Sequence, residues 1–140
     1  PSAPGKVVTP ISSHPRFLSE GGGPVIDEGV IDALTTLGGG QEFLVDVVEA
    51  FRNDARRLFE PLRSAINEQD LRAFKELTHS LKSGGANLGA VRFCQTITAL
   101  KDITTRDLQL NGNAYLEKLV SEFLKLEAAF DRLLKEPARV

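Results

Sequence analysis

Apolar residues recur every third or fourth position along almost the whole chain from residue 25 onward. This spacing places apolar side chains on one face of an α-helix. No segment combines two-residue alternation with the composition typical of strands, and there is no repeat of about 20 to 50 residues. We therefore predict an all-α fold: an up-down helical bundle with a four-helix core and an additional N-terminal helix.

The first 24 residues have a different character. They contain five of the seven prolines and the run Gly21-Gly22-Gly23, without helical periodicity. We predict a flexible linker over residues 1–24, one helical domain over residues 25–136 and a short tail over residues 137–140. His14 lies in the predicted linker, and we assign it no role.

Glycine, proline and capping residues indicate where the first two helices begin and end. The first is expected from Asp27, its cap, to Leu37, and is stopped by the glycines at 38–40. The second is expected over residues 41–67. Pro61 lies inside its pattern and predicts a kink, or a division near Leu58.

Three further helices follow from the same signals. One begins after its cap, Asp70, with Gly89 as a plausible stop. The next carries Phe93, Ile97, Leu100 and Ile103. A loop is expected over residues 104–113, followed by a long helix that starts near residue 116 and ends before residue 137.

Composition excludes several classes of function. A net charge of −2 argues against nucleic-acid binding, which needs a basic excess. The single cysteine, Cys94, cannot form an internal disulfide, fits the reducing cytoplasm and is interpreted as core packing. With only two histidines in addition, we expect no metal site and no cofactor. No run of about 18 apolar residues is present, so no direct membrane contact is expected.

The helix after Asp70 has an unusual polar face. Opposite its apolar stripe, spacings of three and four residues bring Arg72, Lys75, His79, Lys82 and Ala86 together. This face is basic on a chain that is acidic overall. It indicates an anionic partner surface or an anionic group.

His79 is the side chain best suited to nucleophilic chemistry, because a free imidazole has an unshared nitrogen pair near neutral pH. Lys82, one turn later, could neutralise an anionic group on His79. Gly84 and Gly85 cost roughly 1 kcal/mol each inside a helix relative to alanine. They indicate either close approach by a docking protein or a neighbouring helix, or a break in the helix. From periodicity alone, His79 is more simply a solvated surface residue.

The stretch from Thr78 to Ala90 resembles the signature of histidine-containing phosphotransfer (HPt) domains. Ser83 departs from it, standing where the family usually has glycine. The order of helices over residues 25–136 is also similar to the family's bundle. The residues that match are His79, Leu81, Lys82, Asn87, Leu88, Gly89 and Ala90.

The resemblance implies a relay of phosphoryl groups. A histidine of this family accepts the group from an aspartyl phosphate on a receiver domain and passes it to another receiver, which supplies Mg²⁺. The module has no kinase activity, and the chain has no Gly-rich nucleotide loop. The resemblance implies that His79 is the phosphoacceptor and that Lys82 stabilises the charge of the phosphoryl group. The expected docking residues are Arg72, Lys75, Ser83, Gly84, Gly85 and Ala86.

The chain lacks methionine and starts at proline, which suggests a piece of a longer protein. It is similar to the module ending bacterial hybrid sensor kinases of the diffusible-signal-factor, cell-density-sensing type. A parent in the inner membrane, with this module on the cytoplasmic side, is then expected. The module itself is expected to be a monomer. Two alternatives stay open: a helical binding module that carries no phosphate, and an autokinase dimerisation domain.

Overall fold

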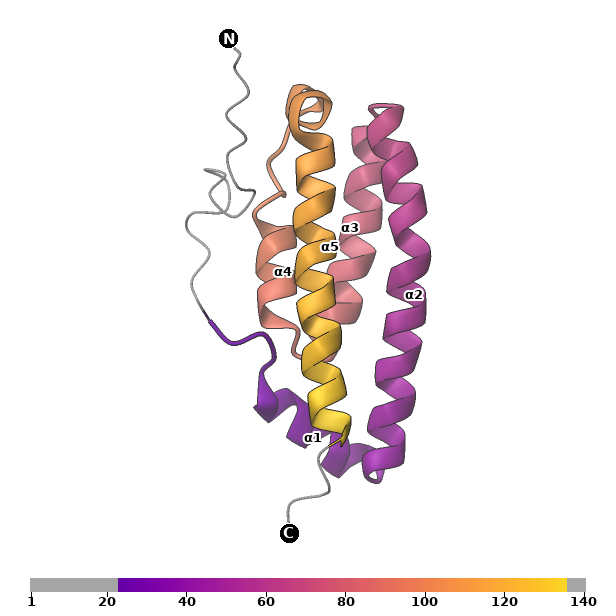
Figure 1. Cartoon of the computed structure of the whole chain (residues 1–140), viewed down its shortest axis with the longest axis vertical. Helices are drawn as coiled ribbons and strands as arrows, with labels where there is room; N and C mark the ends of the chain where they lie inside the picture. Colours follow the sequence, from indigo (N-terminus) through magenta and orange to yellow (C-terminus); the bar gives the residue numbers. More distant parts are fainter. Residues whose placement is uncertain (1–22, 136–140) are drawn as a thin grey trace.

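The computed structural model describes residues 23–135, which form α-helices and no strand (Figure 1). The predicted all-α class is confirmed. The linker predicted over residues 1–24 lies almost entirely outside the described residues, as does the tail predicted over 137–140. The helices are α1 (Glu28–Gly38), α2 (Gln41–Asn67), α3 (Leu71–Asn87), α4 (Val91–Thr98) and α5 (Thr105–Lys135).

Helices α2 to α5 lie alongside one another, and α1 crosses the end of the bundle at which α2 begins (Figure 1). Helix α2 packs against both α3 and α5, and α4 also packs against both. Helices α3 and α5 are therefore diagonal neighbours across the core. This arrangement is the predicted four-helix bundle with an additional N-terminal helix.

Local capping explains where α1 lies. The Asp27 carboxylate accepts a hydrogen bond from the Gly29 amide at 2.9 Å, as its predicted capping role requires. Gly39 ends the helix with a φ of 94°, a conformation that glycine adopts without steric penalty. The Asp27 amide also donates to the Gly89 carbonyl at 2.8 Å. The start of α1 is thus fixed to the connection between α3 and α4.

Helix α2 is continuous from Gln41 to Asn67, so of the two alternatives predicted for Pro61, a kink or a division near Leu58, the division is wrong. Pro61 lies inside the helix and is itself exposed, whereas Leu62 and Ala65 beside it are buried. A proline in a helix interior costs about 3 kcal/mol. Burial of the apolar side chains on either side of Pro61 against the bundle outweighs that cost.

The loop predicted over residues 104–113 is also wrong, because α5 begins at Thr105. The Thr104 amide donates to the Asp107 carboxylate at 2.9 Å, and the Asp107 amide donates to the Thr104 hydroxyl at 3.1 Å. This reciprocal pair is a capping box with aspartate in the acidic position. In contrast, α4 is shorter than predicted and ends at Thr98, although Leu100 and Ile103 are buried as expected of core residues.

Gly112 was interpreted as part of that loop but is buried inside α5. A Cβ at this position would lie 2.7 Å from Cγ2 of Ile66 on α2. The glycine therefore allows α5 to lie against α2, and contact between the helices offsets its low helix propensity.

Replacing Gly112 with valine should lower the free energy of unfolding by about 2 kcal/mol, because Ile66 is buried and stiff at χ1. Urea denaturation followed by circular dichroism measures the change. The matched control is Asn113→Val, which places the same side chain on the adjacent, exposed position of α5 and should change stability by less than about 0.5 kcal/mol. Equal stabilities for the two variants would contradict the packing role of Gly112.

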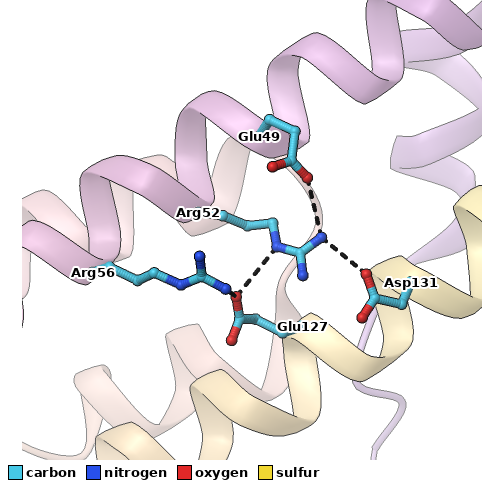
Figure 2. Close-up of polar contacts among 5 residues, drawn as sticks. All are labelled: Glu49, Arg52, Arg56, Glu127 and Asp131. Carbon is cyan, nitrogen blue, oxygen red and sulfur yellow. Dashed lines mark hydrogen bonds and ion pairs between the residues drawn. The ribbon is translucent and has the colours of Figure 1, made fainter.

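Ion pairs join α2 to α5 (Figure 2). The Arg52 guanidinium lies 3.2 Å from the Glu127 carboxylate and 3.0 Å from that of Asp131, and Arg56 also contacts Glu127. Burial by itself lowers the pKa of Arg52, but hydrogen bonds to Asp131 and Glu127 outweigh it and raise the pKa. The carboxylates on α5 therefore have permanently charged partners on α2.

Within the described part of the chain, none of the helices has the length and apolar character needed to cross a bilayer.

Candidate functional site

Helix α3 divides into a buried face and a solvent-facing face. The Asp70 carboxylate accepts a hydrogen bond from the Ala73 amide at 3.0 Å, which confirms the predicted cap. Phe74 and Leu81 are buried to 0% and 1% exposure, and Thr78 is buried beside them. These side chains fix the rotation of α3 about its axis and so decide which residues face solvent.

His79 is exposed on the opposite face, and its imidazole has no hydrogen-bond partner among residues 23–135. Arg72, Ser83 and Ala86 are exposed along the same face, and Lys75 is half-buried there. The sequence prediction of a solvent-facing basic strip around His79 is therefore confirmed.

The cations of this strip differ in their partners. Arg72 lies 3.6 Å from the Glu76 carboxylate, so part of its charge is neutralised. Within residues 23–135, neither Lys75 nor Lys82 has a carboxylate at ion-pair distance. The Lys82 ammonium is therefore free to meet an anionic group one helical turn from its own position, at His79.

Helix α3 runs through Gly84 and Gly85 without a break, which rules out the broken-helix interpretation. A Cβ on Gly84 would lie 3.0 Å from the Phe51 ring of α2, and one on Gly85 would lie 3.4 Å from Cys94 of α4. Gly84 thus makes room for α2, whereas a Cβ on Gly85 would meet α4 at an ordinary van der Waals distance. Gly85 is buried, so its predicted place on a docking surface is not supported, whereas Gly84 is half-buried.

Cys94 of α4 lies against the backbone of Lys82. Its thiol donates to the Lys82 carbonyl at 3.4 Å, and the residue is half-buried. Burial raises the pKa of Cys94, and the nearby Lys82 charge only partly opposes that shift. The thiol is therefore protonated near neutral pH and supports α3 through packing.

The last part of the sequence motif serves the fold. Leu88 and Ala90 are each 1% exposed. Gly89 has a φ of 68°, and a Cβ there would lie 2.9 Å from the Asp27 carbonyl oxygen. Glycine at this position allows the chain to turn after α3, which ends two residues earlier. It also leaves room for the start of α1. Residues 88–90 of the motif therefore do not face solvent.

Sequence reasoning missed a groove beside the strip. It has a volume of about 300 Å³ and runs between α2 and α3, where Phe51 and Leu58 meet Ser80, Leu81 and Gly84. Leu58 of α2 has the spacing of a core position but is only half-buried, because its exposure depends on how closely α3 approaches. The adjacent glycines Gly84 and Gly85 were the sequence signal that could have revealed this groove, since they indicated a close neighbour at this point.

No group of three or more histidine, cysteine or acidic residues in the described chain is placed to hold a metal ion.

Comparison with known proteins agrees with this geometry. The model of the Hpt domain family matches residues 46–136, which begin within α2 and leave α1 outside. The fold is similar to the crystal structure of histidine-containing phosphotransfer protein B (HptB) from Pseudomonas aeruginosa PAO1, with a TM-score of 0.69 and 23% identity. That likeness covers 80% of this chain and 96% of the other. No match was found among curated proteins. Because the family model spans well over half of its length, this chain belongs to the Hpt domain family.

Proposed function

We propose that this chain is a phosphorelay intermediate that accepts a phosphoryl group on His79 from a receiver-domain aspartyl phosphate and passes it to the aspartate of another receiver. One observation carries the proposal: within residues 23–135 the exposed imidazole has no hydrogen-bond partner, and the ammonium group one turn later has no carboxylate at ion-pair distance. Family membership supports the same role.

The transfer needs little from the chain besides position and charge. The unprotonated ring nitrogen of His79 attacks phosphorus, an N–P bond forms, and the P–O bond to the aspartate breaks to leave a carboxylate. The second ring nitrogen releases its proton to water. Lys82 compensates charge on the phosphoryl oxygens. The receiver contributes its aspartate and Mg²⁺. The return step is the reverse, with His79 as leaving group.

Docking is proposed over the exposed face of α3. Arg72 and Lys75 would steer the acidic pocket of a receiver toward His79, while Ser83 and Ala86 leave room for its approach. The α2–α3 groove beside this face offers apolar contact through the half-buried Leu58. Steering by charge acts mainly on the association rate, whereas apolar contact acts on the lifetime of the complex.

The place of this module in a larger system is a further part of the proposal. The parent would be a hybrid sensor histidine kinase in a bacterial inner membrane, of the type that senses diffusible signal factors in cell-density signalling. This module would work on the cytoplasmic side and have no kinase activity of its own.

The test mixes the chain with a receiver domain phosphorylated by acetyl phosphate in the presence of Mg²⁺. We expect a phosphoryl adduct on the chain that is labile in acid and stable in alkali. Incubation with ATP and a separate kinase catalytic domain is the control and should give no adduct. Adduct formation only in that control would indicate an autokinase dimerisation domain, and absence of any adduct would indicate a binding module.

A further inference from the structure

A second groove lies away from His79, between α2 and α5. It is open, has a volume of about 770 Å³, and is floored by Leu116, Val120 and Leu124 of α5. Arg63 of α2 and the α5 residues Glu117 and Lys125 line its rim. An apolar floor with a charged rim is typical of protein–protein contact surfaces.

Exposed leucines extend this surface along α5. Leu110 and Leu124 are 63% and 57% exposed, and the two positions lie about four helical turns apart on nearly the same side of the helix. The strip between them is about 21 Å long. Burial of these two leucines against a partner would stabilise the complex by about 25 cal/mol per Å² of apolar surface removed from water.

The charged residues on the strip can form ion pairs between two copies of the helix. Glu117 and Lys125 lie at equal spacing on either side of Ser121. If a second copy of α5 runs antiparallel with the two-fold axis at Ser121, Glu117 of each copy meets Lys125 of the other. Because Ser121 is small, the two helices can approach closely at the axis.

Both charges are available for this pairing. Glu117 is exposed and has no ion-pair partner in the described chain. The Lys125 ammonium lies 3.4 Å from the Glu122 carboxylate, which Arg92 and Lys118 also contact at 3.2 and 3.3 Å. Since three cations share one carboxylate, Lys125 keeps charge for a second partner, and 49% of its side chain is exposed.

From these observations we infer that the exposed face of α5 pairs with the same face of a second copy, forming an isologous antiparallel dimer in place of the monomer expected from the sequence. Helix α5 is diagonal to α3, so the dimer leaves both His79 side chains free. The inference therefore does not depend on the proposed phosphotransfer. In this register residues 110–132 of the two helices lie side by side over about 33 Å, with each Leu124 near the axis and each Leu110 opposite Arg132 of the other copy. A single pair of helices of this length gives an interface at the small end of the usual range, so we expect a dissociation constant on the order of micromolar.

Sedimentation equilibrium of the full chain from about 1 to 500 µM should show the mean mass rising from one copy toward two. Leu124→Glu should weaken dimerisation at least tenfold. The matched control is Leu37→Glu on α1, because Leu37 is 86% exposed and lies outside the groove. A single-copy mass at all concentrations, or equal effects of the two variants, would overturn the inference.

The register has its own test. In a Cys94→Ser background, Ser121→Cys places a thiol at the two-fold axis, and mild oxidation should link two copies. Ser64→Cys, on an exposed position of α2, is the control and should link far less. Efficient linkage through residue 64 with none through residue 121 would contradict the antiparallel arrangement.

Discussion

The His79→Gln variant is expected to accept no phosphoryl group from a phosphorylated receiver. An amide nitrogen shares its lone pair with the carbonyl, so glutamine keeps the size and polarity of the side chain but has no nucleophile. Because His79 is exposed and has no hydrogen-bond partner in the described chain, the free energy of unfolding should change by less than about 0.5 kcal/mol. Radiolabel transfer measures acceptance, and thermal unfolding measures stability.

The sequence offers a matched control, because the chain has only one other histidine, His14. The same substitution at His14 should leave acceptance at the wild-type level. Label that persists on the His79→Gln variant, at an acid-labile and alkali-stable linkage, would assign the phosphoacceptor elsewhere and end the proposed role of His79.

Replacing Lys82 with alanine should slow phosphoryl transfer about tenfold without abolishing it. A charge-assisted contact contributes roughly 1.5–3 kcal/mol when shielded from water, and less at a half-exposed position such as Lys82. Tenfold in rate corresponds to about 1.4 kcal/mol, near the lower end of that range. Rapid-quench measurement of transfer from the receiver gives the rate.

Lys75→Ala is the matched control, since it removes the same charge from the turn before His79. Helical side chains lean toward the N-terminus, so Lys82 leans toward His79 while Lys75 leans away from it. We expect Lys75→Ala to weaken receiver docking in a salt-dependent manner and to leave single-turnover transfer at saturating receiver unchanged. Identical single-turnover rates for wild type and Lys82→Ala would remove Lys82 from the mechanism.

Much of the fold follows from local signals. The bounds expected for α2 are those observed, and Asp27 and Asp70 cap their helices as predicted. Capping depends on residues within about three positions of one another, so it can be recognised in a sequence. The exposed face of α3, with His79, follows from periodicity for the same reason.

Two of the errors have a common cause. Pro61 and Gly112 each carry an unfavourable local propensity, and both lie inside helices because apolar packing on the bundle outweighs it. Gly112 lies against Ile66, which is far away in the sequence. Propensity depends only on residues close together in the sequence. It therefore misplaced the start of α5.

The amino-acid pattern was sufficient for the helical class and for the solvent-facing basic strip that contains His79, because each depends on spacing within a single helix. The role predicted for His79 came from the resemblance of its motif to a known family. Packing between helices decided the rest. It assigned Gly84 to contact with Phe51, buried Gly85 against α4, and opened the grooves on either side of α2. Such contacts join residues distant along the chain, and their geometry exists only after the helices have packed.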